Sequence, residues 1–388
     1  MVVVEVLFEL IRYSIKQEKL SDETLKGLSQ DTLLSLYKTS KMHDIAHLVA
    51  DALYKNGLLS KDDQMYKPFV HQENLAVYRY ENINYELHRV CDLFEKNKVS
   101  HIPLKGSVIR SLYPEPWMRT SCDIDILIHE DDIDRALELL REQGARVEQK
   151  SFYDVSIYTE NNVHIELHFN LAVEGQNKKT ADVLQEVWDK SNLVDGCAYR
   201  RKMTDEMYYF YHLAHMSKHF AGRGCGIRSF IDVWILDNQD KADVKKRREI
   251  AERGGLDKFM DASSALAKVW LGQQPHTPIT LDMQDFILGS GVYGNMENHI
   301  IAEQKKRGGK FGLAMSRIFL PYKQLKGHYP VLVKHKWLYP FCQVRRWFKL
   351  LFCGGVKRSV KELKSIAQMP KDKIKRTEKM MYQLGLWV

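Results

Sequence analysis

The segment of residues 122–129, CDIDILIH, has isoleucine at every second position, and this pattern restricts the fold more than any other. Because successive side chains of a strand point to opposite faces, the isoleucines share one face and Asp123 and Asp125 share the other. Two such carboxylates lie roughly 6–7 Å apart along a strand. They could bridge two metal ions about 3.5–4 Å apart, or they could be solvent-facing residues of an amphipathic edge strand.

A strand and a glycine turn precede this segment. Residues 99–104 form a short β-like run, followed by Lys105-Gly106-Ser107 and a helical turn at 108–112. A glycine there lets the backbone approach a phosphate, and the N-terminus of the next helix offers unpaired N–H groups to an anion. Lys105 adds a positive charge for triphosphate oxygens. The alternative is a plain turn between a strand and a helix.

Two later strands supply a third acidic residue. Residues 152–159 and 163–169 both alternate, and an Asn-Asn pair between them is typical of a hairpin turn. In the second strand His164, Glu166 and His168 share one face. This strand could lie beside the two aspartates, which would bring a third carboxylate to the same place. The alternative is the polar outer face of a half-buried strand.

Around this core the chain is predicted to be helical. We expect an N-terminal helical region at 1–97, an α/β core at 98–175, a helical domain closing a cleft at 176–300, and a basic, aromatic-rich helical region at 301–388. The predicted fold class is therefore α+β, with a small mixed-sheet core embedded between helical regions. No run of about 18 apolar residues occurs, so no transmembrane helix is expected.

The segment IPLKGSVIRSLYPEPWMRTSCDIDILIHEDDIDRALELL resembles the core of the uncharacterised bacterial nucleotidyltransferase family, within the polymerase-β-like nucleotidyltransferase superfamily. The later stretches HLAHMSKHFAGRGCGIRSFIDVWIL and YPVLVKHKWLYPFCQVRRWF are also similar to members of this family. The family pattern is a glycine turn, a Tyr-Pro loop ending in arginine, a strand with Asp-x-Asp, and a third acidic residue on a later strand. The matching positions are Lys105, Gly106, Ser107, Tyr113, Pro114, Arg119, Asp123, Asp125 and Glu166.

The resemblance implies a nucleotidyltransferase that uses two Mg²⁺ ions, or Mn²⁺, to move a nucleoside monophosphate from a triphosphate such as ATP. In this scheme Asp123, Asp125 and Glu166 hold the metals, and Glu166 takes the proton of the acceptor hydroxyl. The other implied roles concern the nucleotide. The backbone of Gly106 and Ser107 and the Ser107 hydroxyl would cradle phosphates, Lys105 and Arg119 would neutralise charge, and His215, Lys218 and His219 would line the cleft. The acceptor is open between a protein, an RNA and a small molecule or glycan.

A predicted helix at 206–220 carries His212, His215 and His219. His215 and His219 are four residues apart, as in some zinc sites, but no HExxH pattern is present. Zinc ligation, packing and nucleotide contact are therefore three readings of this helix. On the next helix Arg228 and Asp232 are also four apart, and we interpret them as a surface ion pair.

The charge of the chain is divided unevenly. The formal net charge is 58 − 50 = +8, but residues 301–388 hold 21 Lys+Arg and 4 Asp+Glu, a net of +17. Such a tail favours a polyanionic partner, either nucleic acid, a membrane surface or a phosphorylated substrate. Alternatively, the basic patch docks on the acidic body, and aromatic residues such as Trp337, Phe341 and Phe348 pack there.

Six scattered cysteines without a CxxC pair, Cys353 among them, do not form a disulfide framework, so we expect a cytoplasmic protein, with a peripheral membrane contact left open. The N-terminal segment predicts an amphipathic helix and not a signal peptide. Two rival functions remain open. The chain could be a binding protein with a catalytically degenerate transferase fold that holds nucleic acid or membrane, or it could be a zinc hydrolase. The sequence does not determine the oligomeric state.

Overall fold

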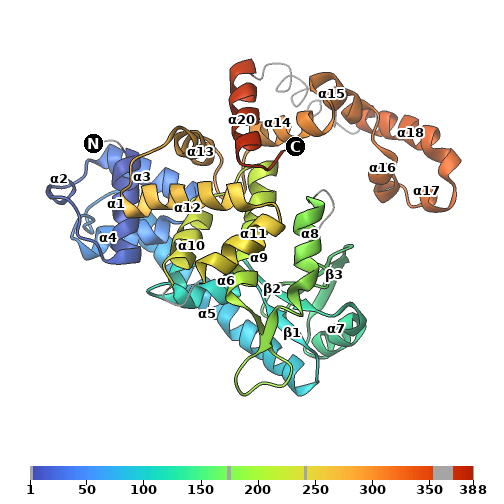
Figure 1. Cartoon of the computed structure of the whole chain (residues 1–388), viewed down its shortest axis with the longest axis horizontal. Coiled ribbons are helices and arrows are strands. Elements are labelled where there is room, and N and C mark those ends of the chain that lie inside the picture. The colour runs from blue at the N-terminus through green and yellow to red at the C-terminus, as the bar shows by residue number, and fades with distance from the viewer. Residues whose placement is uncertain (1–2, 173–175, 240–242, 353–369, 388) are drawn as a thin grey trace.

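The computed structural model describes residues 3–172, 176–239, 243–352 and 370–387. One five-stranded mixed sheet lies between helical regions that precede and follow it in the chain (Figure 1). The predicted α+β fold class is therefore confirmed. Within the described residues, each helix is either too short or too polar to cross a lipid bilayer.

Five helices precede the sheet. The first, α1, buries the side that its spacing predicts, including Leu7, Leu10 and Ile11. The last, α5, is 31 residues long, and Val90 and Phe94 in its second half pack in the core of the sheet. One continuous helix therefore connects the N-terminal helices to the sheet. The bounds are α1 (Val3–Lys16), α2 (Asp22–Leu25), α3 (Gln30–Met42), α4 (Ala46–Lys55) and α5 (Tyr66–Lys96).

The sheet has the strand order β1-β2-β5-β4-β3. β2 and β5 run parallel, and the other neighbouring pairs are antiparallel. Because β2 lies between β1 and β5, the reading of Asp123 and Asp125 as residues of an edge strand is wrong. The bounds are β1 (His101–Pro103), β2 (Asp123–Ile128), β3 (Arg146–Lys150), β4 (Asp154–Tyr158) and β5 (His164–His168).

The two faces of β2 enter different cores. Its three isoleucines are fully buried in the cluster that α5 and α7 (Ile133–Glu142) form with the sheet. Leu127, on the opposite face, joins the larger core of the helical regions. A slip of one residue in the register would turn both aspartates into the apolar cluster, so the isoleucines fix the direction in which the carboxylates point.

The sequence pattern did not predict three of the strands. β3 has mostly exposed residues and no apolar face. β6 (Ser191–Leu193) and β7 (Arg201–Met203) form a hairpin inside the segment predicted to be helical. Each of these two strands has three residues, which is too short for an alternation to be recognised. The hairpin forms a separate two-stranded sheet that lies beside β1, where an isolated bridge joins His101 to Arg200 and the His101 N–H donates to the Tyr199 carbonyl at 3.1 Å.

Within the described residues, seven helices lie between the five-stranded sheet and residue 310 of the chain. α9 is capped by Thr204, whose side chain accepts a hydrogen bond from the Met207 N–H. The bounds are α8 (Lys178–Leu184), α9 (Asp205–Gly222), α10 (Arg228–Asp237), α11 (Val244–Arg253), α12 (Asp257–Gly272), α13 (Pro278–Leu288) and α14 (Met296–Lys306).

The C-terminal region divides into an arm and a returning helix. The arm, residues 310–352, extends away from the body (Figure 1) and has a small core of its own, which includes Leu325 and Leu332. The returning helix packs on the body, where Arg376 bonds to Asp282 and Asp285. The bounds are α15 (Lys310–Ile318), α16 (Tyr322–His328), α17 (Val331–Lys334), α18 (Tyr339–Phe352) and α20 (Lys371–Gln383).

The arm corrects one expectation about the basic region. Trp337, Phe341 and Phe348 are each more than half exposed, so the reading in which these aromatic rings pack on the body is wrong. The five cysteines within the described residues are free thiols. Cys353 lies outside the described residues.

Candidate active site

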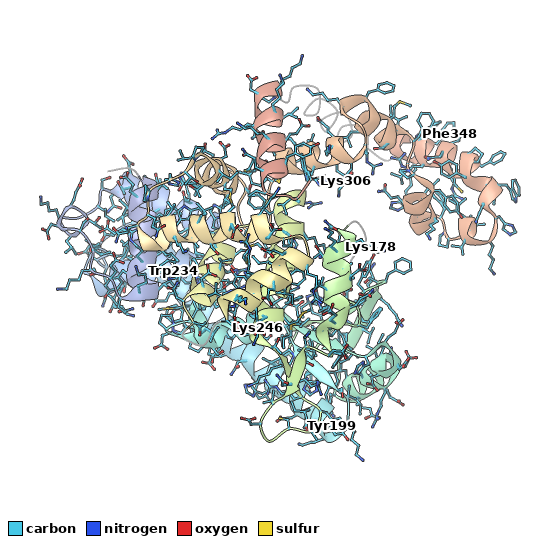
Figure 2. The ribbon with its side chains drawn as sticks, viewed as in Figure 1. Lys178, Tyr199, Trp234, Lys246, Lys306 and Phe348 are labelled. Carbon is cyan, nitrogen blue, oxygen red and sulfur yellow. The ribbon has the colours of Figure 1, made fainter. Side chains whose placement is uncertain are left out.

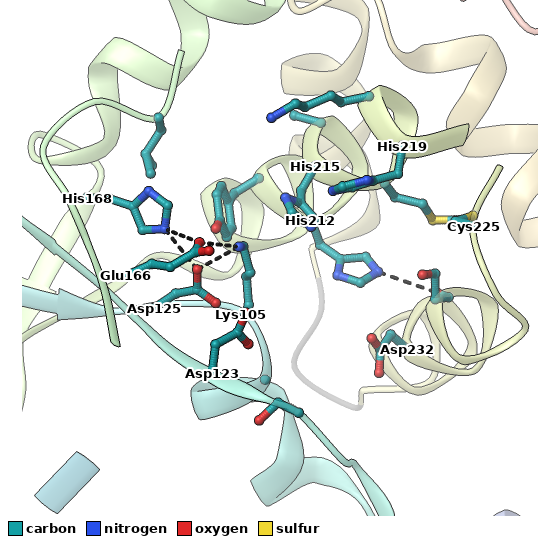
Figure 3. Close-up of a pocket in the computed structure, with 18 of the residues that line it drawn as sticks. Lys105, Asp123, Asp125, Glu166, His168, His212, His215, His219, Cys225 and Asp232 are labelled. Carbon is teal, nitrogen blue, oxygen red and sulfur yellow. Dashed lines mark hydrogen bonds and ion pairs between the residues drawn. The ribbon is translucent and has the colours of Figure 1, made fainter. Parts of the chain in front are cut away.

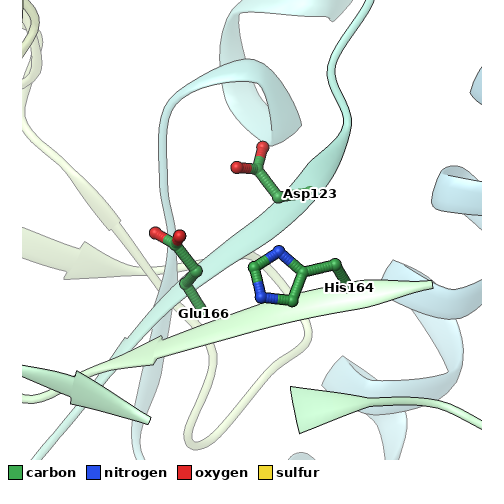
Figure 4. Close-up of side chains that lie close together, drawn as sticks. All are labelled: Asp123, His164 and Glu166. Carbon is green, nitrogen blue, oxygen red and sulfur yellow. The ribbon is translucent and has the colours of Figure 1, made fainter. Parts of the chain in front are cut away.

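The pairing of β2 with β5 brings the predicted acidic residues together. In this parallel pair Asp123 lies opposite His164, and Asp125 lies opposite Glu166. Figure 4 shows Asp123, His164 and Glu166 projecting from the two strands on the same side of the sheet. The expectation that Glu166 lies beside both aspartates is therefore correct, and we call Asp123, Asp125 and Glu166 the acidic cluster.

Two groups of potential metal ligands share Glu166. The ligand atoms of Asp123, His164 and Glu166 all lie within 4.8 Å of one another, and so do those of Asp125, Glu166 and His168. The two histidines were not predicted as ligands, although they share the strand face of Glu166. The side chain of His164 already bonds the Ser156 hydroxyl through Nε2 at 2.7 Å.

Asp125 is the most enclosed member of the cluster. Its Oδ1 lies 2.6 Å from Lys105 Nζ and 2.8 Å from His168 Nε2, and the residue is 3% exposed. Burial alone would raise the pKa of Asp125, but the charge of Lys105 and the hydrogen bond from His168 hold it well below its ordinary value. Burial opposes the charge of His168, yet its bonds to Asp125 and Glu166 raise its pKa to about 9.

Asp123 has the opposite electrostatic environment. Its burial, and then the neighbouring charge of Asp125, raise the pKa of Asp123 above its ordinary value. At neutral pH, Asp125 is therefore an anion held between two cations, whereas Asp123 lacks a comparable partner among the described residues. A cation beside Asp123 would be stabilised by the adjoining carboxylates.

The glycine turn beside the cluster is held in an unusual conformation. Lys105 has a φ of 45°, which is rare for a residue with a β-carbon. Its carbonyl accepts a hydrogen bond from the Tyr208 hydroxyl at 2.9 Å, and its ammonium group binds the acidic cluster. Gly106 then begins α6 (Gly106–Ile109), and a β-carbon there would meet the Ser121 β-carbon at 3.2 Å. The backbone of Gly106 therefore approaches the segment just before β2 closely, which favours glycine.

Arg110 fastens this turn, and sequence reasoning missed it. Its Nε donates to the Gly106 carbonyl and its Nη2 donates to the Ser121 hydroxyl, both at 2.7 Å. Burial, together with the nearby charge of Arg119, lowers the pKa of Arg110 to about 10. An arginine inside a turn has no recognisable pattern, so only the contacts identify Arg110 as the residue that positions Gly106.

Ser107 follows Gly106 in α6 and lies outside the lining of the cleft. Its N–H donates to the Leu104 carbonyl at 3.1 Å, and its hydroxyl is buried without a hydrogen-bond partner in the described part of the chain. Lys105 and Gly106 line the cleft, but Ser107 does not. The contact between the Ser107 hydroxyl and a phosphate that the resemblance implies therefore stays a prediction, made for a hydroxyl that is buried in this structure.

Arg119 forms a buried ion pair with Asp232. Its Nε and Nη2 donate to the two carboxylate oxygens of Asp232, each at 2.8 Å, and its Nη1 donates to the Thr120 carbonyl. Asp232 is fully buried and also accepts the Tyr113 hydroxyl at 2.6 Å. The interpretation of Arg228 and Asp232 as a surface pair is wrong. The guanidinium that was expected to neutralise a triphosphate is already engaged, and Arg119 acts here as a link between the core and α10.

Arg228 makes a second link across the same wall. Its Nη1 lies 2.6 Å from a carboxylate oxygen of Asp44 and 3.0 Å from the Thr120 carbonyl. Asp44 precedes α4, Thr120 precedes β2, and Arg228 begins α10. Three segments that are distant in sequence therefore meet at one side of the site.

His215 and His219 of α9 face the acidic cluster from the opposite side of the cleft, whereas the His212 ring turns toward the Ser229 carbonyl at the start of α10 (Figure 3). The ring centroids of His215 and His219 are 4.5 Å apart. Burial lowers the pKa of His215 well below its ordinary value, and burial with the nearby Lys218 charge lowers that of His219 to about 4. Both rings are neutral at neutral pH. Among the described residues, the groups of potential metal ligands do not include them, so the zinc reading has no geometric support.

Between these walls lies a cleft of about 640 Å³. This volume is within the range of small-molecule sites. A second hollow of about 540 Å³ adjoins it. The residues that line both spaces are Gln176, Lys218, His219 and Arg223. From the predicted site the cleft gathers Lys105, Gly106, Arg119, Asp123, Asp125, Glu166, His215, Lys218 and His219.

Comparison with known proteins identifies one family. The family model described as "Uncharacterised nucleotidyltransferase" matches residues 30–272, a span that contains the acidic cluster, the glycine turn and α9. Curated proteins give no match to the chain. Among solved structures, the antibiotic-resistance factor ANT(2'')-Ia is similar at 10% identity and a TM-score of 0.27, over 50% of this chain and 91% of that chain.

Proposed function

Because the chain belongs to the family of uncharacterised nucleotidyltransferases, we propose that it transfers a nucleoside monophosphate from a nucleoside triphosphate to an acceptor hydroxyl with the help of two divalent cations. The observation that carries this proposal is the convergence of three carboxylates from two paired strands beside a glycine turn, inside one cleft. ATP is the donor that we would test first.

The acidic cluster has the donor atoms that such cations require. Carboxylate oxygens are the preferred ligands of Mg²⁺ and also suit Mn²⁺, and Asp123 has a raised pKa that a neighbouring cation would relieve. Asp123, Asp125 and Glu166 would hold the ions. When bound, two divalent cations neutralise triphosphate charge and stabilise the attacking and leaving oxygens of an in-line displacement.

The residues of the chain then position the reactants, which is most of what phosphoryl transfer requires. The Gly106 backbone, at the start of α6, would approach the phosphates, and Lys105 would add a positive charge near them. As the acceptor oxygen bonds to the α-phosphorus, the bond from that phosphorus to the bridging oxygen breaks and pyrophosphate leaves. Glu166, whose side chain is 31% exposed, would take the proton of the acceptor hydroxyl.

The α9 wall would hold the rest of the nucleotide. Neutral His215 and His219 can donate one hydrogen bond and accept another, and both line the cleft opposite the acidic cluster. Lys218 is a cation on the same wall, although its burial and then the charge of Lys105 lower its pKa. A triphosphate between α9 and the sheet would restore a favourable environment to that ammonium group.

For the acceptor we propose the second hollow. Lys218 and Arg223 stand in the wall that it shares with the cleft, and Lys306 lies further along. Within the described lining these cations outnumber the single carboxylate, that of Glu303, and Trp387 adds an aromatic surface. An acceptor with an anionic group would therefore be attracted to this hollow while its hydroxyl reaches the cleft.

The test is transfer of label from NTPs carrying radioactive α-phosphorus, with Mg²⁺ or Mn²⁺ and with the protein itself, RNA, or a cell extract as acceptor. Asp125→Asn should lower the rate by at least a hundredfold, since it removes a charged ligand from a water-poor site. Asp134→Asn, an exposed residue of α7, is the matched control and should change nothing. Undiminished transfer by Asp125→Asn would refute the assignment, and nucleotide binding without transfer to any acceptor would favour a degenerate binding protein.

A further inference from the structure

One side of the arm helix α18 exposes large apolar side chains. Phe341, Val344 and Phe348 recur at spacings of three and four, so they share a face of the helix. Trp337, in the turn before α18, contacts Phe341 with ring centroids 6.2 Å apart. The exposed fractions are 68% for Trp337, 64% for Phe341, 44% for Val344 and 57% for Phe348. Contiguous exposed apolar side chains of this size mark a contact surface.

The opposite side of α18 is firmly held inside the arm. The Tyr339 hydroxyl and the Gln343 amide both donate to the Leu320 carbonyl, at 2.7 and 2.6 Å. Gln343 and Cys342 are buried. The contacts on that side fix the rotation of the helix about its axis. The apolar face is therefore presented outward by the packing of the arm, as Phe348 shows in Figure 2.

The charge of the arm is of one sign. Residues 304–352 contain no aspartate or glutamate, and the arm itself contains nine lysines and arginines. Arg345 and Lys349 each follow a residue of the apolar face by one position, so they flank that face along one side of the helix. An apolar face with tryptophan, bordered by cations, is the composition of helices that lie in the interface of a membrane.

We infer that the arm binds the surface of a lipid bilayer that contains anionic phospholipids, and that the Phe341–Phe348 face enters the boundary between headgroups and acyl chains. The cations of the arm attract it to the anionic surface, and burial of the apolar face stabilises its insertion between the headgroups and the acyl chains. Exposed aliphatic residues favour lipid over single-stranded nucleic acid as the partner. Val333 and Val344 are 65% and 44% exposed, and they gain from contact with acyl chains but offer no ring on which a base could stack.

The experiment is co-sedimentation of the whole chain with vesicles of phosphatidylcholine alone and of phosphatidylcholine mixed with phosphatidylglycerol. The double variant Phe341→Ser/Phe348→Ser should bind the anionic vesicles at least tenfold more weakly, because it removes two rings from the buried face. The matched control is Tyr78→Ser/Tyr85→Ser on α5, where two rings are 67% and 62% exposed outside the arm; it should bind as the unaltered chain does.

The electrostatic part is tested separately. Arg345→Gln/Lys349→Gln should weaken binding roughly fivefold for each charge removed, and added salt should abolish that difference. Failure of the unaltered chain to pellet with anionic vesicles, or full binding by Phe341→Ser/Phe348→Ser, would overturn the inference. So would preferential binding of single-stranded RNA in competition with vesicles. A lipid-free dimer that dissociates in Phe341→Ser/Phe348→Ser would assign the face to a second copy of the chain instead.

Discussion

The buried pair of Arg119 and Asp232 allows the sharpest test of how the site is assembled. Asp232 is fully buried, and Arg119 donates two hydrogen bonds of 2.8 Å to its carboxylate. Asp232→Ala would leave the guanidinium in the interior without its counter-charge. Breaking a buried pair in this way costs about 3–5 kcal/mol of folding free energy.

The assay is thermal unfolding by calorimetry. A loss of 3 kcal/mol lowers the Tm by roughly 6–12 °C in a domain of 150–250 residues. The matched control is the exposed pair of Arg248 and Asp261, whose side chains are 39% and 56% exposed. Asp261→Ala should cost less than about 1 kcal/mol, because water screens that pair.

A double-mutant cycle separates the pair from its surroundings. Replacing both partners by apolar residues of similar size, Arg119→Met/Asp232→Leu, removes both buried charges together, so it should cost less than the sum of the two single changes by at least about 2 kcal/mol. Additive losses, or a loss below about 1 kcal/mol for Asp232→Ala, would show that the carboxylate and the guanidinium do not depend on one another, and would refute this account of the wall.

Three further outcomes are expected. Arg110→Lys, which cannot hold Gly106 and Ser121 together, should lower kcat/KM for transfer about a hundredfold while the Tm shows that the chain still folds. Chelation of divalent cations should abolish transfer, and added Mg²⁺ or Mn²⁺ should restore it; activity in excess chelator would contradict the proposed chemistry. Burial lowers the pKa of both His43 and His47 from 6.5 to about 4, so the unfolded chain binds protons more readily and the stability present above pH 6.5 is lost as the pH falls to about 4. Each histidine should contribute about 3 kcal/mol to this loss, and His47→Gln should make the measured unfolding free energy less dependent on pH across that range.

Much of the acidic cluster could be predicted from local patterns. The isoleucine alternation alone determines that Asp123 and Asp125 share a face, because a strand has a period of two. The same rule placed His164, Glu166 and His168 together on a second strand. The glycine turn at Lys105-Gly106-Ser107 could also be predicted, since glycine is the residue that best allows the backbone to approach a phosphate closely. Helix α1 and most other helices followed from their apolar spacing.

The errors arose where a side chain has a choice of partners. Arg119 lies 113 positions from Asp232 in the chain, and spacing within one helix suggested Arg228 as the partner instead. Strands β6 and β7 were missed for a different reason, since three residues are too few to show the alternation of a strand.

The sequence by itself determined which residues are on the same face of each strand and helix, and that the last part of the chain is strongly basic. These properties depend on neighbours along the chain, which a repeat of two or 3.6 residues reports directly. Only the tertiary structure decided that β2 pairs with β5, that Asp125 is held by Lys105 and His168, and that the apolar side of α18 faces outward. Those outcomes depend on contacts between distant segments, and on the burial that sets which charges are stable, neither of which a local pattern encodes.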